Sequence, residues 1–269
     1  LPGAPLQHER HRRRHRRRPL TREQFAEQQA YARLLRLDLR REAQDRADTS
    51  YDLDDQLRAR GREGMLTTFA SAGATVENSE HDREAAITFA PGGVDRGGAA
   101  LALNRPAEAV VDDNRVGFDR GGVVERWDNS PAGLVHGFTV TAPPAGREPL
   151  ALSVEVAGAT PYLVPGGEQV RFEADSGILQ HLNYSGVYAT DAGGRDLPVC
   201  LEVADASIII GVDDSDAAYP IEIESVVLYS GLIDALYKAQ YRGMTTFSTV
   251  DLTTGIPTPV GPIGFGVIE

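Results

Sequence analysis

The side chain best placed to act in a hydrolysis reaction is Glu125, which lies two residues before Trp127. Side chains alternate along a strand, so these two would share one strand face. Glycoside hydrolysis needs paired carboxylates roughly 5–9 Å apart. With 39 acidic residues in the chain, some pair meets that condition by chance. We therefore expect Glu125 to be a solvent-facing strand residue and assign no catalytic residue.

The run Asp213-Asp214-Ser215-Asp216 gathers three carboxylates, the ligand type that hard cations prefer. Asp213, Asp214 and Asp216 are therefore candidate calcium ligands. The run lacks the glycine and the distal glutamate of an EF-hand loop. The interpretation that we favour is a polar hairpin turn between strands at 207–212 and 220–226. No other cofactor is expected.

A Ser-His-Asp triad would need His81, His136 or His181, and the sequence has no Gly-x-Ser-x-Gly motif. It also lacks a Walker loop, a Gly-x-Gly-x-x-Gly loop and a His-Glu-x-x-His zinc motif. His136 lies within a strand-like run, which predicts a packed or edge histidine. Cys200 is the only cysteine, so it forms no intrachain disulfide and is interpreted as a small structural hydrophobe.

Four aromatic residues, Phe118, Trp127, Phe138 and Tyr184, offer rings on which a sugar could stack. Trp127 and Tyr184 are the candidate ligand-binding residues of this set. Aromatic residues make up only 7% of the chain, however, so we expect most of them to be needed in the core.

The elements that would position these residues are short β-type runs, separated by turn-forming clusters such as Pro91-Gly92-Gly93 and Asp191-Ala192-Gly193-Gly194. Leu150 to Val156 and Leu197 to Val203 alternate apolar and other residues, which puts one face on a core. This regular succession of short strands and turns predicts an antiparallel β-sandwich over residues 63–226, either one domain or two small ones. Strands are predicted near 65–70, 84–90, 115–119, 123–128, 134–142, 150–157, 169–173, 179–184, 186–190, 197–203, 207–212 and 220–226.

Residues 1–62 are predicted to form a separate extension, helical or disordered, that is dispensable for folding. The Arg- and His-rich run at 7–18 is interpreted as a disordered or non-native tail, the alternative being a site for nucleic acid, an anionic polymer or a divalent metal. A capping-box signature at Thr21 opens an imperfect apolar stripe that predicts a helix to about residue 47.

Charge divides the chain into two unlike parts. The first 64 residues hold 16 Arg and no Lys against 11 acidic residues, whereas the whole chain carries a net charge of −12. The remaining body is therefore strongly acidic, which argues against nucleic acid or an anionic membrane as its partner. No apolar run approaches 18 residues, so no membrane-spanning helix is expected. The chain begins at Leu1 without a signal peptide, so any export signal is expected to lie outside it.

Residues 114–142, Asn183-Tyr184-Ser185-Gly186, 191–198, Val212-Asp213-Asp214 and Tyr219-Pro220-Ile221 follow one another in a characteristic order. Together they resemble the β-rich region that precedes FG-GAP (integrin-like) β-propeller repeats in large secreted bacterial proteins. The resemblance covers residues 85–226 and implies an extracellular or cell-surface location, with a propeller downstream. That family usually ends in Thr-Ile-Asp-Pro, whereas 222–225 reads Glu-Ile-Glu-Ser, so the exit into the next domain is expected to differ.

The last part of the chain, residues 227–269, predicts a short helix near 231–239 followed by a hairpin. Residues 247–255 end in Asp-x-x-Thr-Gly, and Val260-Gly261-Pro262-Ile263-Gly264 follows. This segment is similar to one blade unit of secreted bacterial β-propellers, which implies a propeller truncated here. Neither resemblance brings catalytic residues.

These observations predict a non-catalytic structural or binding module of a secreted or cell-surface bacterial protein. It would serve adhesion or act as a platform for a downstream propeller, with a surface glycan or protein as its partner. The alternative function is a secreted carbohydrate-binding or glycan-active hydrolase domain, which depends on Glu125 beside Trp127.

Overall fold

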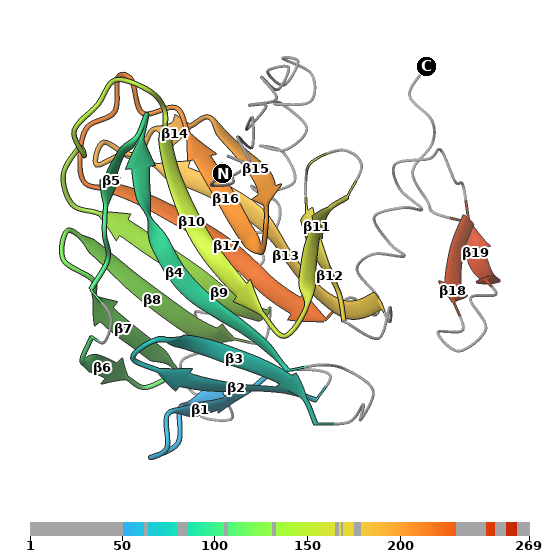
Figure 1. The fold of residues 1–269 in the computed structure, drawn as a ribbon. Coiled ribbons are helices and arrows are strands. Elements are labelled where there is room, and N and C mark those ends of the chain that lie inside the picture. The colour runs from blue at the N-terminus through green and yellow to red at the C-terminus, as the bar shows by residue number, and fades with distance from the viewer. Residues whose placement is uncertain are drawn as a thin grey trace, which may run out of the picture.

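The computed structural model describes residues 51–61, 64–79, 86–104, 107–130, 133–164, 167, 169–174, 179–229, 246–250 and 257–262. The regular elements of these residues are β-strands, and two antiparallel sheets pack face to face as a β-sandwich (Figure 1). The predicted fold class is therefore confirmed. The predicted helices at 21–47 and 231–239 lie outside the described residues. In the part that is described, no helix is both long and apolar enough to cross a membrane.

The first sheet has eight strands, in the order β1-β2-β3-β4-β10-β16-β15, with β5 paired to β4. Strand β10 pairs with β4 on one side and β16 on the other, so it brings the two halves of the sheet together. The strands are β1 (Arg58–Arg60), β2 (Met65–Ala70), β3 (Gly73–Asn78), β4 (Ile87–Arg96), β5 (Ala99–Leu101), β10 (Leu150–Ala157), β15 (Val199–Ala204) and β16 (Ser207–Val212).

The second sheet has nine strands, in the order β11-β12-β13-β17-β9-β8-β7-β6, with β14 paired to β13. Strand β17 lies between β13 and β9 and is the last strand that the chain adds to the sandwich. The strands are β6 (Ala109–Asp112), β7 (Arg115–Asp119), β8 (Val123–Ser130), β9 (Gly133–Val140), β11 (Thr160–Leu163), β12 (Gln169–Glu173), β13 (Leu179–Thr190), β14 (Asp196–Leu197) and β17 (Ile221–Tyr229).

A separate two-stranded sheet pairs β18 (Thr246–Val250) with β19 (Pro257–Pro262) in antiparallel fashion. This pairing agrees with the strand, turn and strand predicted for the C-terminal segment. Whether the hairpin is one unit of a propeller stays a prediction.

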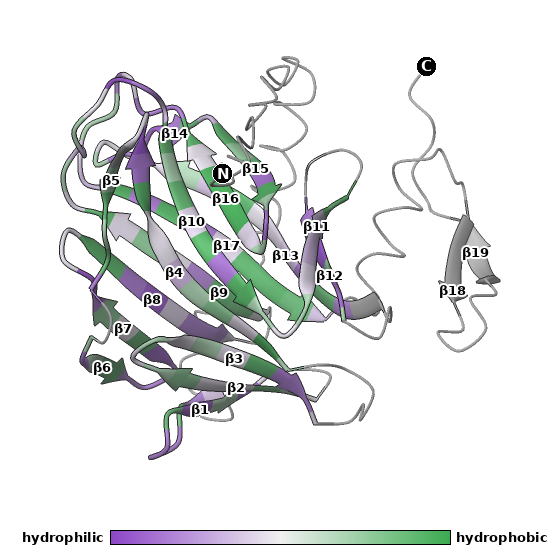
Figure 2. Cartoon of the chain, in the orientation of Figure 1, coloured by the Kyte–Doolittle hydropathy of each residue, from purple (hydrophilic) through white to green (hydrophobic). Residues whose placement is uncertain are grey.

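Buried and more exposed residues alternate along β10 and β16, both of which include the apolar stretches seen in Figure 2. Leu150, Leu152 and Val154 of β10 are buried, and the residues between them are more exposed. Leu197, Val199 and Leu201 are buried in the same way. The predicted inward faces of both runs are therefore confirmed.

Pro91-Gly92-Gly93 was predicted to be a turn but lies inside the ten-residue strand β4. The register against β10 moves from Ser153–Gly93 to Val154–Pro91, so Gly92 is the extra residue of a β-bulge. Proline lacks an N–H group and is tolerated in a sheet at bulges, and a Cβ atom at Gly92 would collide with the Ser153 side chain. The turn-forming residues thus bend a strand here.

The sandwich begins earlier than the predicted boundary at residue 62. Strand β1 pairs with β2, and Ala59 belongs to the core. The Asn129 side-chain amide donates hydrogen bonds to the main-chain oxygens of Tyr51 and Arg60, each at 2.9 Å. Residues 51–60 were assigned to the extension because their sequence is polar, but their main chain completes a sheet edge.

Strand β17 also runs past the predicted end of the sandwich at 226. Val227 and Tyr229 face the core, and Tyr229 pairs with Leu182 of β13. The run from Val226 to Tyr229 therefore closes the sandwich, whereas the sequence suggested that it opens the next segment.

We predict that a chain starting at residue 51 keeps the thermal stability of the full chain, whereas a chain starting at residue 61 loses about 3 kcal/mol. The loss reflects the pairing of β1 and the burial of Ala59, Leu53 and Leu57 against the core. Differential scanning calorimetry of the two deletions should show melting temperatures roughly 6–12 °C apart. Equal melting temperatures would show that β1 contributes nothing to stability.

Candidate functional site

Two neighbouring strands bring ionisable side chains into the space between the sheets. On β7 and the turn after it, Val116, Phe118 and Arg120 point inward in alternation. On β8, Glu125 points inward between Val123 and Trp127. Two glycines with positive φ, at 121 and 122, form the tight turn that lets Arg120 and Glu125 face each other.

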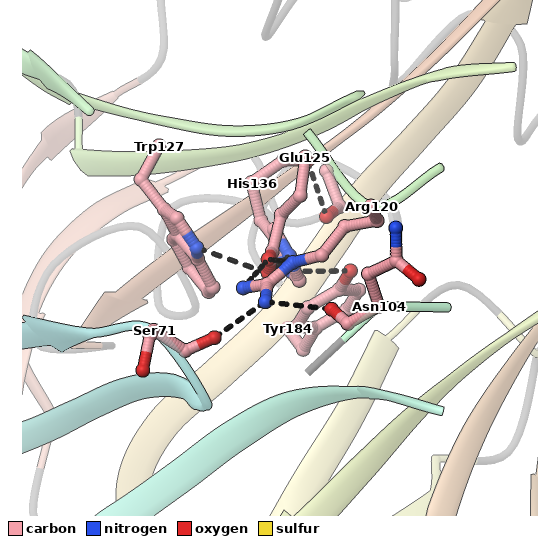
Figure 3. A network of polar contacts seen from close by, with 8 residues as sticks. Ser71, Asn104, Arg120, Glu125, Trp127, His136 and Tyr184 are labelled. Atoms are coloured by element: carbon pink, nitrogen blue, oxygen red, sulfur yellow. Dashed lines mark hydrogen bonds and ion pairs between the residues drawn. The ribbon is translucent and has the colours of Figure 1, made fainter. Parts of the chain in front are cut away.

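The Glu125 carboxylate is the centre of this cluster (Figure 3). Its Oε2 atom accepts hydrogen bonds from Nε and Nη2 of Arg120 at 2.9 and 2.6 Å. Its Oε1 atom accepts one from Nε1 of Trp127 at 3.2 Å and lies 3.0 Å from Nε2 of His136. Arg120, Glu125 and His136 each have an exposed fraction of 0%. The expectation that Glu125 faces solvent was therefore wrong.

The Arg120 guanidinium links the ion pair to the main chain. Its Nη1 group donates to the carbonyl oxygen of Ser71, in the turn between β2 and β3, and to that of Asn104 at 3.2 Å (Figure 3). Its carbon lies 4.6 Å from the centre of the Phe118 ring, a cation–π contact. Ser71 lies in a turn between two strands of the first sheet and Arg120 follows a strand of the second, so the Arg120 side chain ties the two sheets together.

His136 connects the carboxylate to an aromatic layer. Its ring stacks on that of Trp127, with ring centres 3.6 Å apart and planes 8° apart. The Tyr184 hydroxyl lies 3.3 Å from its Nδ1 atom. An ionised carboxylate can only accept, so the Nε2–H group of His136 donates a hydrogen bond to Glu125. In a neutral ring with its proton on Nε2, the Nδ1 atom accepts a hydrogen bond from the Tyr184 hydroxyl.

Burial sets the protonation states of the cluster. Burial lowers the pKa of His136 below its ordinary value, although Glu125 opposes that change. Burial alone would raise the pKa of Glu125, but hydrogen bonds from His136 and Arg120, together with the positive charge of Arg120, outweigh it and lower that pKa. Burial raises the pKa of Tyr184. The cluster at neutral pH is thus an ionised Glu125–Arg120 pair with neutral His136 and Tyr184.

A chain of carboxylate, imidazole and hydroxyl resembles a proton relay, but a relay acts on a substrate only when one end can be reached. Here Glu125, His136 and Tyr184 are all buried, and their polar atoms bond to each other and to Arg120 and Trp127. The arrangement as it stands stabilises an internal charge pair.

The two candidate sugar-stacking residues are in the core. The ring of Trp127 lies against His136, Phe69 and Phe89, with centres 3.6, 6.0 and 6.3 Å away. Tyr184 is also completely buried. Neither ring presents a face to solvent, so these two residues do not form a sugar platform in this structure. The expectation that most aromatic residues are needed in the core is confirmed for both.

The three candidate calcium ligands do not converge. Asp214 is buried and paired with Arg96 of β4, and its carboxylate also accepts from the Tyr219 hydroxyl. Asp213 accepts from the main-chain nitrogen of Ser215 at 3.2 Å, as in a polar turn. Among the residues that the structure describes, no group of three or more His, Cys, Asp or Glu side chains is placed to hold a metal ion.

The segment that carries these aspartates was predicted to be a hairpin turn, and that prediction was wrong. Strand β16 belongs to the first sheet and β17 to the second, so residues 213–220 cross between the sheets. The Asp214–Arg96 ion pair anchors the crossover to the end of β4. A hairpin and a crossover of this length look alike in sequence, since both are polar and rich in turn-forming residues.

Sequence reasoning missed Arg120, the residue that gives Glu125 its charge partner. A signal for it was present, because Arg120 continues the inward phase of Val116 and Phe118. His136 was correctly expected to be a packed histidine. The main-chain acceptors at Ser71 and Asn104 could not be predicted from residue type, since every residue has a carbonyl oxygen.

Comparison with known proteins adds little to this picture. No protein-family model and no curated protein matches the chain. Among solved structures, a family GH92 α-mannosidase from Bacteroides thetaiotaomicron aligns over 72% of this chain and 34% of its own, with 8% identity and a TM-score of 0.35. Its complex with mannoimidazole aligns over 73% and 30%, with 9% identity and a TM-score of 0.33. The chain thus spans about a third of that enzyme, and likeness at this level carries no argument about function.

We predict that Glu125→Gln lowers the free energy of unfolding by about 3–5 kcal/mol, because it leaves the Arg120 charge buried without a counter-charge. Chemical denaturation measures this loss, and Glu77→Gln, on the exposed side of β3, is the matched control with a change under about 0.5 kcal/mol. The double variant Arg120→Met/Glu125→Gln should cost less than the two single changes together. Strictly additive costs would contradict the ion pair.

We also predict that acidification destabilises the fold through His136. Its pKa is lowered in the folded state, so below pH 6.5, the ordinary value, the unfolded chain binds more protons than the folded one. Stability is complete above that pH and falls as the pH drops from 6.5 towards the folded-state pKa. Glu125 acts in the same direction at lower pH. Between pH 7.5 and 5 the melting temperature should fall more steeply for the natural chain than for His136→Gln. Equal falls in the two proteins would contradict this assignment.

Proposed function

We propose that residues 51–229 form a non-catalytic structural or binding module of a secreted or cell-surface protein. The observation that carries this proposal is the closure of the Glu125 cluster. The best catalytic candidate of the sequence has its carboxylate oxygens bonded to Arg120, Trp127 and His136, and none of these side chains is exposed. These four side chains are therefore closed off from any substrate at the surface of the described sandwich.

The way in which the chain enters and leaves the sandwich supports a role as a platform. The Tyr51 carbonyl accepts a hydrogen bond from Asn129 near the end of β8. Asn129 pairs with Leu134 of β9, and Leu134 pairs with Val227 of β17, just before the strand ends at Tyr229. Both connections therefore lie at one end of the second sheet, two strands apart. Such a module can be attached at one end, where a following propeller would continue the chain, and present its opposite end to a surface glycan or a protein.

A glycan-active hydrolase remains the alternative function. It requires Glu125 to reach a sugar, which the closed cluster opposes unless the sheets separate. A carbohydrate-binding role without catalysis would have to use surface residues in place of Trp127 and Tyr184. The acidic body disfavours polyanionic glycans, because like charges repel.

We predict that the full chain releases no reducing ends from a panel of neutral and acidic polysaccharides, and that Glu125→Gln behaves identically. Reducing-sugar assays over long incubations measure this, and circular dichroism shows that the variant is folded at the assay temperature. Glu77→Gln serves as the folded control. Release by the natural chain would refute the proposal, and its loss in Glu125→Gln but not in Glu77→Gln would establish the hydrolase in its place.

A further inference from the structure

A group of side chains on the outer face of the second sheet is buried although it points away from the core. Val226 and Leu228 of β17 have exposed fractions of 1% and 8%, and Asn183 of β13 has 2%. Their neighbours in the strands, Val227 and Tyr184, face the core, so these three face outward. Val226 and Leu228 form a cluster separate from the main core. We call Val135, Val226, Leu228 and Asn183 the outer patch.

The outer patch needs a third layer to cover it. The outer face of a sandwich sheet ordinarily meets water and carries polar residues. Among the described residues, only Val135 packs an apolar side chain against Val226 and Leu228. Three aliphatic side chains side by side on a sheet cannot shield one another from above. Among the residues that the structure describes, the buried Oδ1 atom of Asn183 also has no hydrogen-bond partner, which is costly unless the covering layer supplies a donor.

The sequence that follows β17 fits this requirement. Residues 231–239 carry apolar side chains at helical spacing, with Asp234 and Lys238 on the opposite side. The apolar stripe consists of Leu232, Ile233, Leu236 and Tyr237. Nine helical residues span about 14 Å, and the three strands β13, β17 and β9 together span about 10 Å. The segment begins two residues after Tyr229, where the outer patch ends, and Tyr237 carries a donor that could serve Asn183.

We propose that residues 231–239 form a helix that folds back onto β17 and covers the outer patch. The helix adds a third layer to the sandwich and buries apolar surface on both sides of β17. It also fixes the direction in which the chain leaves for the β18–β19 hairpin. This inference does not depend on the proposed function, because it concerns the packing of one segment on one face.

The single lysine of the chain, Lys238, provides a direct test. A lysine-specific protease can cut the full chain only after this residue, and its rate reports how often the segment leaves the sheet. We expect cleavage at least about tenfold slower than in a free peptide of residues 230–246. Leu228→Ser should speed it by about tenfold or more, whereas Glu222→Ser, exposed on the outer face of the same strand, should not.

A second substitution separates docking from a general loss of stability. Leu236→Ser leaves both sheets intact, so it should speed cleavage with a smaller fall in melting temperature than Leu228→Ser causes. If Leu228 and Leu236 contact each other, the double variant is cut no faster than the faster single variant. Cleavage as fast as in the free peptide, or additive effects, would overturn the proposal. Protection that depends on protein concentration would instead identify a second copy as the cover, and tryptic protection at Arg33 and Arg36 with Lys238 unprotected would identify residues 21–47.

Discussion

The buried Arg120–Glu125 ion pair is stable only if the surrounding sandwich supplies hydrogen-bond partners for both side chains. Removing each ion from water costs several kcal/mol, and mutual attraction offsets that cost only when the remaining hydrogen-bonding positions are filled. Here the partners are Trp127 on the same strand as Glu125, His136 on the neighbouring strand β9, and the carbonyl oxygens of Ser71 and Asn104. A shift of one sheet along the other would separate the Arg120 guanidinium from the Ser71 carbonyl oxygen.

The neutral state of His136 follows from the same constraint. A second positive charge beside Arg120 would have no matching carboxylate, so burial favours the neutral imidazole, which donates a hydrogen bond to Glu125 and accepts one from Tyr184. The cluster carries no net charge and uses its polar groups internally. Glu125, Trp127 and His136, which suggested chemistry in the sequence, thus have a structural role inside the core.

The fold class and five strands could be predicted from the sequence with their observed bounds, at 65–70, 115–119, 150–157, 169–173 and 207–212. Each has clear alternation or β-branched residues between turn-forming residues. The missed strands, β1, β3, β5, β6 and β11, are short, polar or rich in Gly and Ala, and neighbouring strands rather than local preference hold them. Only part of the site could be predicted: Glu125 was found, but its burial depends on the strand phase that Val123 and Trp127 share with it.

Strand phase also explains how β17 differs from the other strands. From Ile221 to Glu224, buried and more exposed residues alternate, as expected for a strand with one face in water. From Ser225 to Tyr229 every residue is buried, and the run Val226-Val227-Leu228-Tyr229 is apolar on both faces. Such a run is typical of a strand that is covered on both sides. The sandwich was predicted to end at 226 because the alternation stops there. The loss of alternation instead marks the point where a third layer is needed on the outer face.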